Sequence, residues 1–214
     1  DGIQTKLDIF QNYYKGFMAE ANEFIIDIKF GEQKKLEYAR YNALKRGFIA
    51  KQDKEITAKA VLKVYSKIYN VELSPTGQNL DMIGNQDKYA IKVKLKKGNK
   101  LLGMNEFKLI PPGSRHYIVE WVGHKMEKKE GLASLYYDFI NLTYNGKNKG
   151  IFAIEELFNK ELLERNGRRE GLIFYIKNNA SKYLKVYNEN KLKKKNYYKN
   201  IHLLELKLNE FYSG

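Results

Sequence analysis

Residues 88–96 read KYAIKVKLK, in which apolar and basic side chains alternate. Successive side chains of an extended strand point to opposite faces, so this period of two predicts a strand with one apolar and one basic face. The apolar face carries Tyr89, Ile91, Val93 and Leu95. The basic face carries Lys88, Lys92, Lys94 and Lys96. The apolar face is therefore expected to line a core, and the lysines to remain outside it.

Weaker alternation on both sides of this stretch predicts a sheet. Residues 145–146 are Asn-Gly, a pair that suits a tight turn between two antiparallel strands. We expect a hairpin with arms at 136–144 and 150–154, and further strands at 24–30, 58–69, 71–73, 107–110 and 172–176.

Helical patterns interrupt the strands. A helix is predicted over 32–46, ended by Gly47, with a buried stripe of Leu36, Ala39, Ala43 and Leu44. A second is predicted over 115–130, with Ser114 as its N-cap and Ile118, Val122 and Met126 at helical spacing. A third is predicted over 155–166. Together the elements predict an α+β fold, an antiparallel sheet with packed helices.

The composition restricts the function classes. The 214 residues include 39 Lys and Arg and 25 Asp and Glu, giving a net charge of +14, and contain no Cys. Disulfides and thiolate chemistry are therefore excluded. The excess charge suits a phosphate-bearing partner or a merely solvated, compositionally biased surface. Because most of the cations are Lys rather than Arg, the sequence argues against a nucleic-acid partner. No apolar run is long enough for a membrane-spanning helix.

Two lysines and one glutamate form the most specific candidate site. Lys92 and Lys94 share a strand face, and Glu120 lies on a later predicted helix. In the small lobe of a protein kinase, a strand Lys holds phosphates and a helix Glu orients it. This spacing predicts a small-lobe-like arrangement in which the three side chains converge. The alternative is that the lysines only protect a strand edge from pairing.

Other patterns are less specific. His116, Glu120 and His124 are four residues apart and could ligate a metal, or form a solvent-facing polar stripe. The polar loop 77–84, with a glycine at each end, could cradle a phosphate or be an ordinary turn. Arg168 and Arg169 could bind an acidic partner or lie in a surface loop.

Several stretches, in the same order along the chain, resemble the CotH family of spore-coat protein H-like atypical kinases. They lie at 102–104, 115–121, 129–132, 137–139, 145–147, 150–156 and 168–171. The resemblance implies a kinase that uses ATP and Mg²⁺ to phosphorylate Ser on a protein substrate. It also implies a location in the cell envelope, the spore coat or outside the cell.

The resemblance assigns roles by position. It makes Lys92 or Lys94 the cation that contacts phosphate and Glu120 its partner. Arg115, Glu155 and Glu156 match motif positions of the family, which the resemblance places near the nucleotide.

The chain also departs from the family. Residues 77–79 are Gly-Gln-Asn where relatives tend to carry Gly-Asp and an aromatic residue, and no Asp follows Asp138. Phosphoryl transfer needs carboxylates that hold Mg²⁺. We therefore expect no catalytic residue in this chain, and interpret it as an N-terminal fragment that is inactive alone. The alternative is a non-catalytic basic module that docks an acidic protein or polymer. The expected parts are an N-terminal segment (1–31), a kinase-like part (32–176) and a tail rich in Lys and Asn (177–214).

Overall fold

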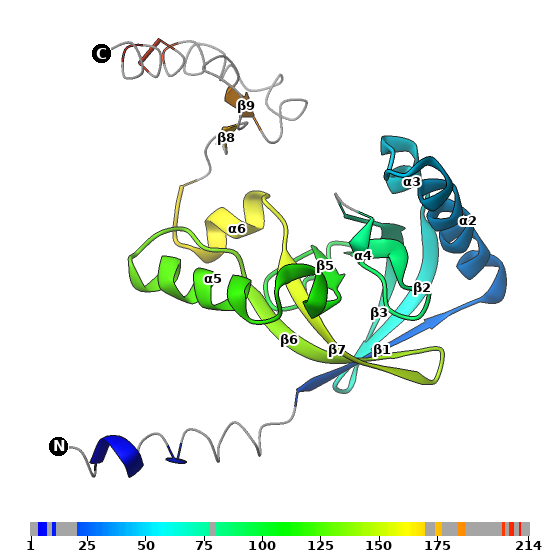
Figure 1. Cartoon of the computed structure of the whole chain (residues 1–214), viewed down its shortest axis with the longest axis horizontal. Helices are drawn as coiled ribbons and strands as arrows, with labels where there is room; N and C mark the ends of the chain where they lie inside the picture. The colour runs from blue at the N-terminus through cyan, green and yellow to red at the C-terminus, as the bar shows by residue number, and fades with distance from the viewer. Residues whose placement is uncertain are drawn as a thin grey trace.

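In the computed structural model, the chain forms a closed barrel with helices on two sides (Figure 1). The structure describes residues 21–77 and 80–169, together with 4–7, 10–11, 174–176, 184–186, 203, 206–207 and 210. The predicted tail over 177–214 lies almost entirely outside the described residues.

Seven strands make the barrel, in the order β1-β2-β3-β4-β5-β7-β6. They are β1 (Asn22–Ile28), β2 (Ala58–Val64), β3 (Lys67–Pro75), β4 (Ile91–Leu95), β5 (Glu106–Ile110), β6 (Tyr137–Tyr144) and β7 (Lys147–Glu156). Neighbours in this order are antiparallel, and the barrel is closed by parallel pairing of β1 with β6. A separate pair, β8 (Phe174–Ile176) and β9 (Leu184–Val186), is antiparallel.

The alternating side chains fill the barrel as the sequence predicts. Ile91, Val93 and Leu95 point inward from β4 and are buried. They meet inward-facing residues of every other barrel strand, including Phe24, Leu62, Leu73, Phe107, Ile140 and Phe152. Phe24 and Phe107 pack edge to face, with ring centroids 6.3 Å apart. The barrel interior is therefore the main hydrophobic core.

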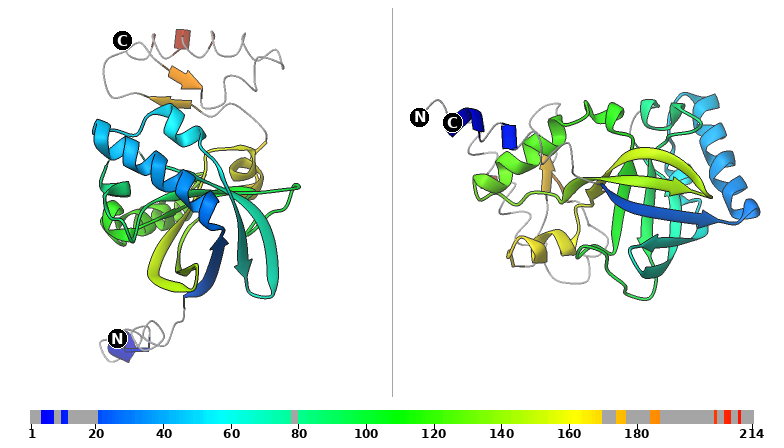
Figure 2. Two further views of the ribbon diagram at one scale, coloured as in Figure 1. Left: turned by 90° about the vertical axis from the view of Figure 1, so that its right-hand side faces the viewer. Right: turned by 90° about the horizontal axis from the view of Figure 1, so that it is seen from below.

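The helices lie on two sides of the barrel, α2 and α3 on one and α5 and α6 on the other (Figures 1 and 2). Their bounds are α2 (Phe30–Arg46), α3 (Lys51–Glu55), α4 (Asp81–Gly84), α5 (Val119–Lys129) and α6 (Lys160–Arg165), and a 3-10 turn η1 spans Pro112–Arg115. Helix α2 buries Leu36, Ala39 and Ala43 of the predicted stripe and leaves Leu44 partly buried, and Gly47 ends it in the left-handed region as predicted. Ala43 belongs to a small second core with Met82, Ile83, Ala90 and Ile110.

The predicted fold class was wrong. The chain is not an α+β, kinase small-lobe-like sheet with packed helices, because its sheet closes into a mixed seven-stranded barrel. The residues from 22 to 26 on β1 pair with those from 140 to 144 on β6. Alternation identifies a strand but not its neighbour, so a contact across more than a hundred residues is invisible in the pattern.

Three local predictions also need correction. The strand predicted over 58–69 is a hairpin, because the chain turns at Tyr65, whose φ is 52°. The helix predicted from residue 115 begins at Val119, and Ser114 does not cap it, since its hydroxyl donates to the carbonyl of Pro111. The helix predicted over 155–166 is reduced to α6, because β7 extends through Glu156. The apolar residues at helical spacing in the helix predicted over 115–130 are exposed; they are Ile118, Val122 and Met126.

Asn145 connects the hairpin turn to the strand that closes the barrel. Its side-chain Oδ1 accepts from the backbone N–H of Ile28 at 2.8 Å, and its backbone N–H donates to the Ile26 carbonyl at 2.8 Å. Its φ of 48° lies in the left-handed region, which Asn tolerates better than Ala. We expect Asn145→Ala to lower the free energy of unfolding by about 2 kcal/mol, measured by urea denaturation.

A matched control is Asn99→Ala. The Asn99 side chain makes one exposed hydrogen bond, to the Lys96 carbonyl. Its loss should change the free energy of unfolding by about 0.5 kcal/mol or less. Equal effects of the two substitutions would contradict the role given to Asn145 in closing the barrel.

Candidate functional site

A row of polar side chains crosses the outer face of the barrel. Cross-strand pairing sets the residues of this polar row directly opposite one another on β3, β4, β5, β7 and β6. They are Ser74, Lys92, Lys108, Glu155 and Tyr137, in that order. Because inward residues alternate with these on each strand, the polar row faces away from the core.

Lys92 and Lys94 are both held by Glu106. The Lys94 ammonium lies 2.9 Å from the Glu106 carboxylate, and that of Lys92 lies 3.5 Å from it. Burial opposes ionisation of Glu106, but the hydrogen bond from Lys94 and the two positive charges outweigh it and lower its pKa. The hydrogen bond to Glu106 in turn raises the pKa of Lys94. Glu106 and Lys94 therefore stay ionised at neutral pH, and Lys92 shares the same carboxylate.

A second charged group continues the polar row toward α5. Lys108 donates to Oε1 of Glu155, and the Arg115 guanidinium lies 3.8 Å from Oε2 of Glu155. Arg115 also donates to Glu120 at 3.0 Å. Glu155 is almost fully buried, and the two neighbouring cations compensate its negative charge. Arg115, from η1, thus connects Glu120 on α5 to the sheet.

Three buried polar atoms in this second group have no hydrogen-bond partner among the described residues. They are Nε of Arg115, Oε2 of Glu155 and the hydroxyl of Tyr137. Burial, followed by the charges of Glu120 and Glu155, raises the pKa of Tyr137 to about 12, so its hydroxyl keeps its proton. Unpaired buried polar atoms are uncommon in folded proteins and call for an explanation, such as a bound ion or ligand.

An open hollow adjoins the polar row. It has a volume of about 690 Å³ and is lined by residues of η1, α4, β6 and β7. Phe139, in its wall, packs edge to face on Tyr137 of the polar row, with ring centroids 5.9 Å apart. Pro111, Tyr117, Ile118 and Ile151 give the hollow a mainly apolar lining. A ligand could therefore contact the charges and an apolar surface together.

The residues predicted from the sequence only partly converge. Lys92 and Lys94 do share an outer face, but their carboxylate partner is Glu106 rather than Glu120. Glu120 is on the same side of the sheet and reaches it through Arg115. Glu156 faces the barrel interior, opposite Phe107, and pairs with Arg165.

Sequence reasoning missed Lys108 and Glu106. Both lie on β5 at a spacing of two, and their pairing with β4 places them beside Lys92 and Lys94. The charge alternation of Glu106 and Lys108 was a usable signal, but only with the register known.

The other residues singled out from the sequence do not come together as a binding site within the described part of the chain. His116 lies outside α5, in the left-handed region, so it does not share a helix face with His124. Within the described residues no group of three or more His, Asp or Glu could hold a metal ion. Two residues of the loop 77–84 lie outside the described part. Arg168 donates to the Gly131 carbonyl.

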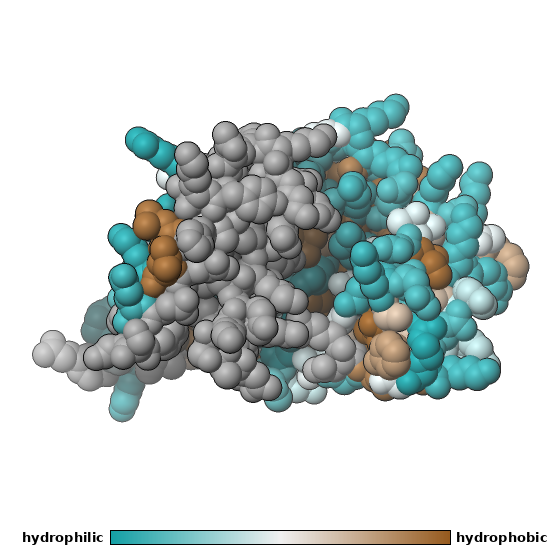
Figure 3. Space-filling model, turned by 90° about the horizontal axis from the view of Figure 1, so that it is seen from above, coloured by the Kyte–Doolittle hydropathy of each residue, from teal (hydrophilic) through white to brown (hydrophobic). Residues whose placement is uncertain are grey.

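Charged side chains also lie outside the polar row. In the coloured part of the surface seen from above, hydrophilic side chains predominate, with hydrophobic areas between them (Figure 3). Many of the lysines are paired with acids on neighbouring elements, such as Lys63 with Asp27 and Lys96 with Glu72. In the described part of the chain, no helix is long and apolar enough to cross a membrane.

No protein-family model matches this chain, and no curated protein matches it.

Proposed function

We propose that the polar row, together with Lys94 and Arg115 beside it, binds the phosphates of ATP, and that the chain is the nucleotide-binding part of a protein kinase similar to the CotH family. The observation that carries this proposal is the Nε of Arg115, a buried donor that has no hydrogen-bond partner among the described residues and lies beside Glu155 and Lys108. A phosphate oxygen accepts charge-assisted hydrogen bonds of the kind that a guanidinium offers.

The cations are arranged to hold a chain of phosphates. Lys92 and Lys108 are directly opposite each other on adjacent strands, and Lys94 is two residues from Lys92 on the same face. Opposed residues of antiparallel strands have Cβ atoms about 5 Å apart, a spacing that lets two ammonium groups contact neighbouring phosphates. Glu106, on the adjacent strand, forms ion pairs with Lys92 and Lys94 and so holds them in place. In protein kinases, a helix glutamate holds the phosphate-binding lysine in the same way.

The remaining atoms of the site suit the other parts of the ligand. Mg²⁺ is usually held by one or two carboxylates, with phosphates and water completing its shell. Oε2 of Glu155, which has no hydrogen-bond partner in the described residues, is the carboxylate oxygen available for such a contact. The apolar hollow beside Tyr137 would receive the base.

Binding is not transfer, and we expect this chain alone to transfer no phosphate. A kinase needs carboxylates that hold Mg²⁺ and position the attacking hydroxyl. No Asp follows Asp138 in the sequence. Asp138 itself lies on the other face of β6 from Tyr137 and Phe139. Its Oδ2 accepts a hydrogen bond from the Tyr136 hydroxyl. A Ser-containing protein substrate would therefore depend on residues that this chain does not supply.

Calorimetric titration with four ligands, namely ATP, tripolyphosphate, adenosine and polyglutamate, tests the proposal. In the presence of Mg²⁺ we expect saturable binding of ATP, weaker binding of tripolyphosphate, and much weaker binding of adenosine, because the charges hold the phosphates. The alternative, a basic module that docks acidic polymers, predicts a different order, with polyglutamate binding at least as tightly as ATP. Absence of saturable ATP binding, or equal affinity for ATP and adenosine, would overturn the proposal.

A further inference from the structure

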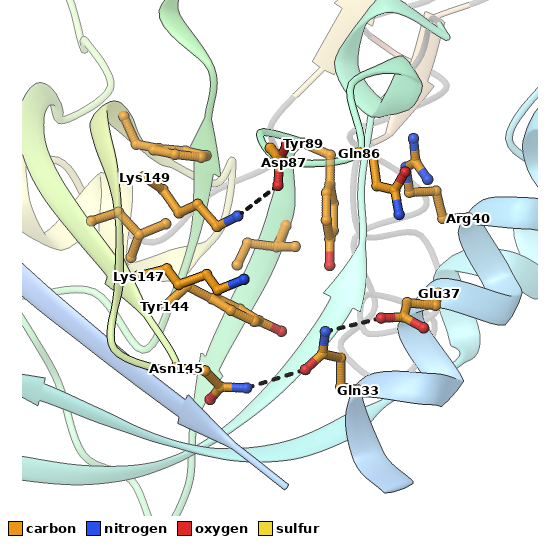
Figure 4. A pocket seen from close by; sticks show the side chains of 13 residues that line it. Gln33, Glu37, Arg40, Gln86, Asp87, Tyr89, Tyr144, Asn145, Lys147 and Lys149 are labelled. Atoms are coloured by element: carbon orange, nitrogen blue, oxygen red, sulfur yellow. Dashed lines mark hydrogen bonds and ion pairs between the residues drawn. The ribbon is translucent and has the colours of Figure 1, made fainter. Parts of the chain in front are cut away.

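A second cavity lies at one mouth of the barrel, apart from the polar row. Its volume is about 410 Å³, within the range of small-molecule sites. Helix α2, the start of β4 and the turn between β6 and β7 surround it (Figure 4). Ile91 lines this cavity, whereas Lys92, the next residue, belongs to the outward polar row. The two sites therefore use opposite faces of β4.

The deep part of the cavity is apolar. Ile91, Leu142 and Phe152 are inward-facing core residues that also line it, so they form its floor. The rings of Tyr89 and Tyr144 form part of its wall (Figure 4). This surface suits a flat or compact apolar body, which would gain by leaving water.

Most charged groups at the rim are already engaged. Arg40 donates to the carbonyls of Ile83 and Gly84, at 2.6 and 2.8 Å. Lys149 pairs with Asp87 at 3.1 Å. Gln33 joins the two sides of the rim by donating to Glu37 and accepting from Asn145, as the dashed lines in Figure 4 show.

Lys147 is the exception at this rim. In the part of the chain that the structure describes, no hydrogen bond or ion pair engages its ammonium group, which points over the cavity beside Tyr144 (Figure 4). The Tyr144 hydroxyl is buried without a hydrogen-bond partner among the same residues. Burial, followed by the influence of Tyr89, raises its pKa, so it remains a neutral donor. Beside the apolar floor there thus lie a cation that no described residue engages and a tyrosine hydroxyl that keeps its proton.

We infer that the barrel mouth is a binding site for a small organic anion with an apolar body, such as an aromatic carboxylate. The apolar body packs on Leu142 and Phe152, and the carboxylate accepts hydrogen bonds from Lys147 and Tyr144. The engaged rim charges fix the shape of the opening without competing for this ligand. The site is independent of ATP binding, since it shares no residue with the polar row.

Two probes with the same body test this inference, 4-phenylbutyrate and the uncharged 4-phenylbutan-1-ol. Amide chemical shifts measured during titration should show saturable changes at Tyr89, Tyr144 and Lys147 with the carboxylate. We expect the alcohol to bind about tenfold more weakly, because it lacks the charge-assisted hydrogen bond to Lys147. Lys147→Met should remove this difference, and Tyr144→Phe should weaken carboxylate binding without unfolding the chain.

Lys128→Met, on the exposed surface of α5, is the matched control and should leave both affinities unchanged. Calorimetry with ATP on Lys147→Met separates the two sites, since its ATP affinity should match the unaltered chain. Equal binding of acid and alcohol, or shifts spread over the surface without saturation at the barrel mouth, would overturn the inference.

Discussion

Replacing Arg165 with Leu should lower the free energy of unfolding by about 3 kcal/mol, as expected when one partner of a buried ion pair is removed. Glu156 is only 1% exposed and faces the inside of the barrel end. The Arg165 Nε donates to it at 3.0 Å, and a second guanidinium nitrogen also contacts it. Without Arg165, the carboxylate keeps one donor, the Tyr136 amide at 2.9 Å, which is too little to hold a buried charge.

Urea denaturation with two comparison variants makes this test specific. Lys160→Ala on the same helix removes an exposed pair with Glu164 and should cost about 0.5 kcal/mol. Arg165→Leu combined with Glu156→Leu removes both charges, and should recover much of the lost stability. If the double variant is less stable than Arg165→Leu, the buried charge is not the cause of the loss.

The second large effect is on ligand binding. Lys92→Met combined with Lys94→Met should weaken ATP binding by at least about tenfold, because each lysine removed takes away a charge-assisted hydrogen bond to phosphate. Both side chains are partly exposed, at 34% and 53%, so the replacements should leave the barrel intact. Calorimetry with ATP and Mg²⁺ measures the affinity, and far-ultraviolet circular dichroism checks the fold.

Lys63→Met is the matched control for this pair. Lys63 is another strand lysine, paired with Asp27 of the neighbouring strand at 2.7 Å and similarly exposed. Its replacement should leave ATP affinity unchanged. If Lys63→Met weakens binding as much as the double variant, the net charge of the chain attracts ATP and the polar row has no special role.

Local structure followed closely from the sequence where one pattern was enough. The alternation in 88–96 predicted which side chains of β4 are buried. Asn145-Gly146 predicted the turn between β6 and β7, and both residues have the positive φ that such a turn requires. Gly47 predicted the end of α2.

Features that depend on strand register, or on pairing between distant segments, could not be predicted from the sequence. The two-residue turn at Tyr65 and Ser66 carries no Gly, Asn or Pro, so the alternation of β2 and β3 looked continuous. The kinase small-lobe pattern predicts a helix glutamate, Glu120, as the partner of Lys92, whereas the strand register, which the sequence does not show, places Glu106 of β5 there. For the same reason, barrel closure could not be predicted. The sequence patterns of β1 and β6 each show only that one face of the strand is apolar, and not that the two strands pair.

Protection of individual lysines from acetylation, measured by peptide mass spectrometry with and without ATP and Mg²⁺, tests the central claim most directly. The proposed site predicts that modification of Lys92, Lys94 and Lys108 falls in proportion to the fraction of chain bound. It predicts no change at Lys63, on another strand, or at Lys147, at the barrel mouth. Unchanged modification of Lys92, Lys94 and Lys108 at saturating ATP, or equal protection of Lys63, would contradict phosphate binding by the polar row.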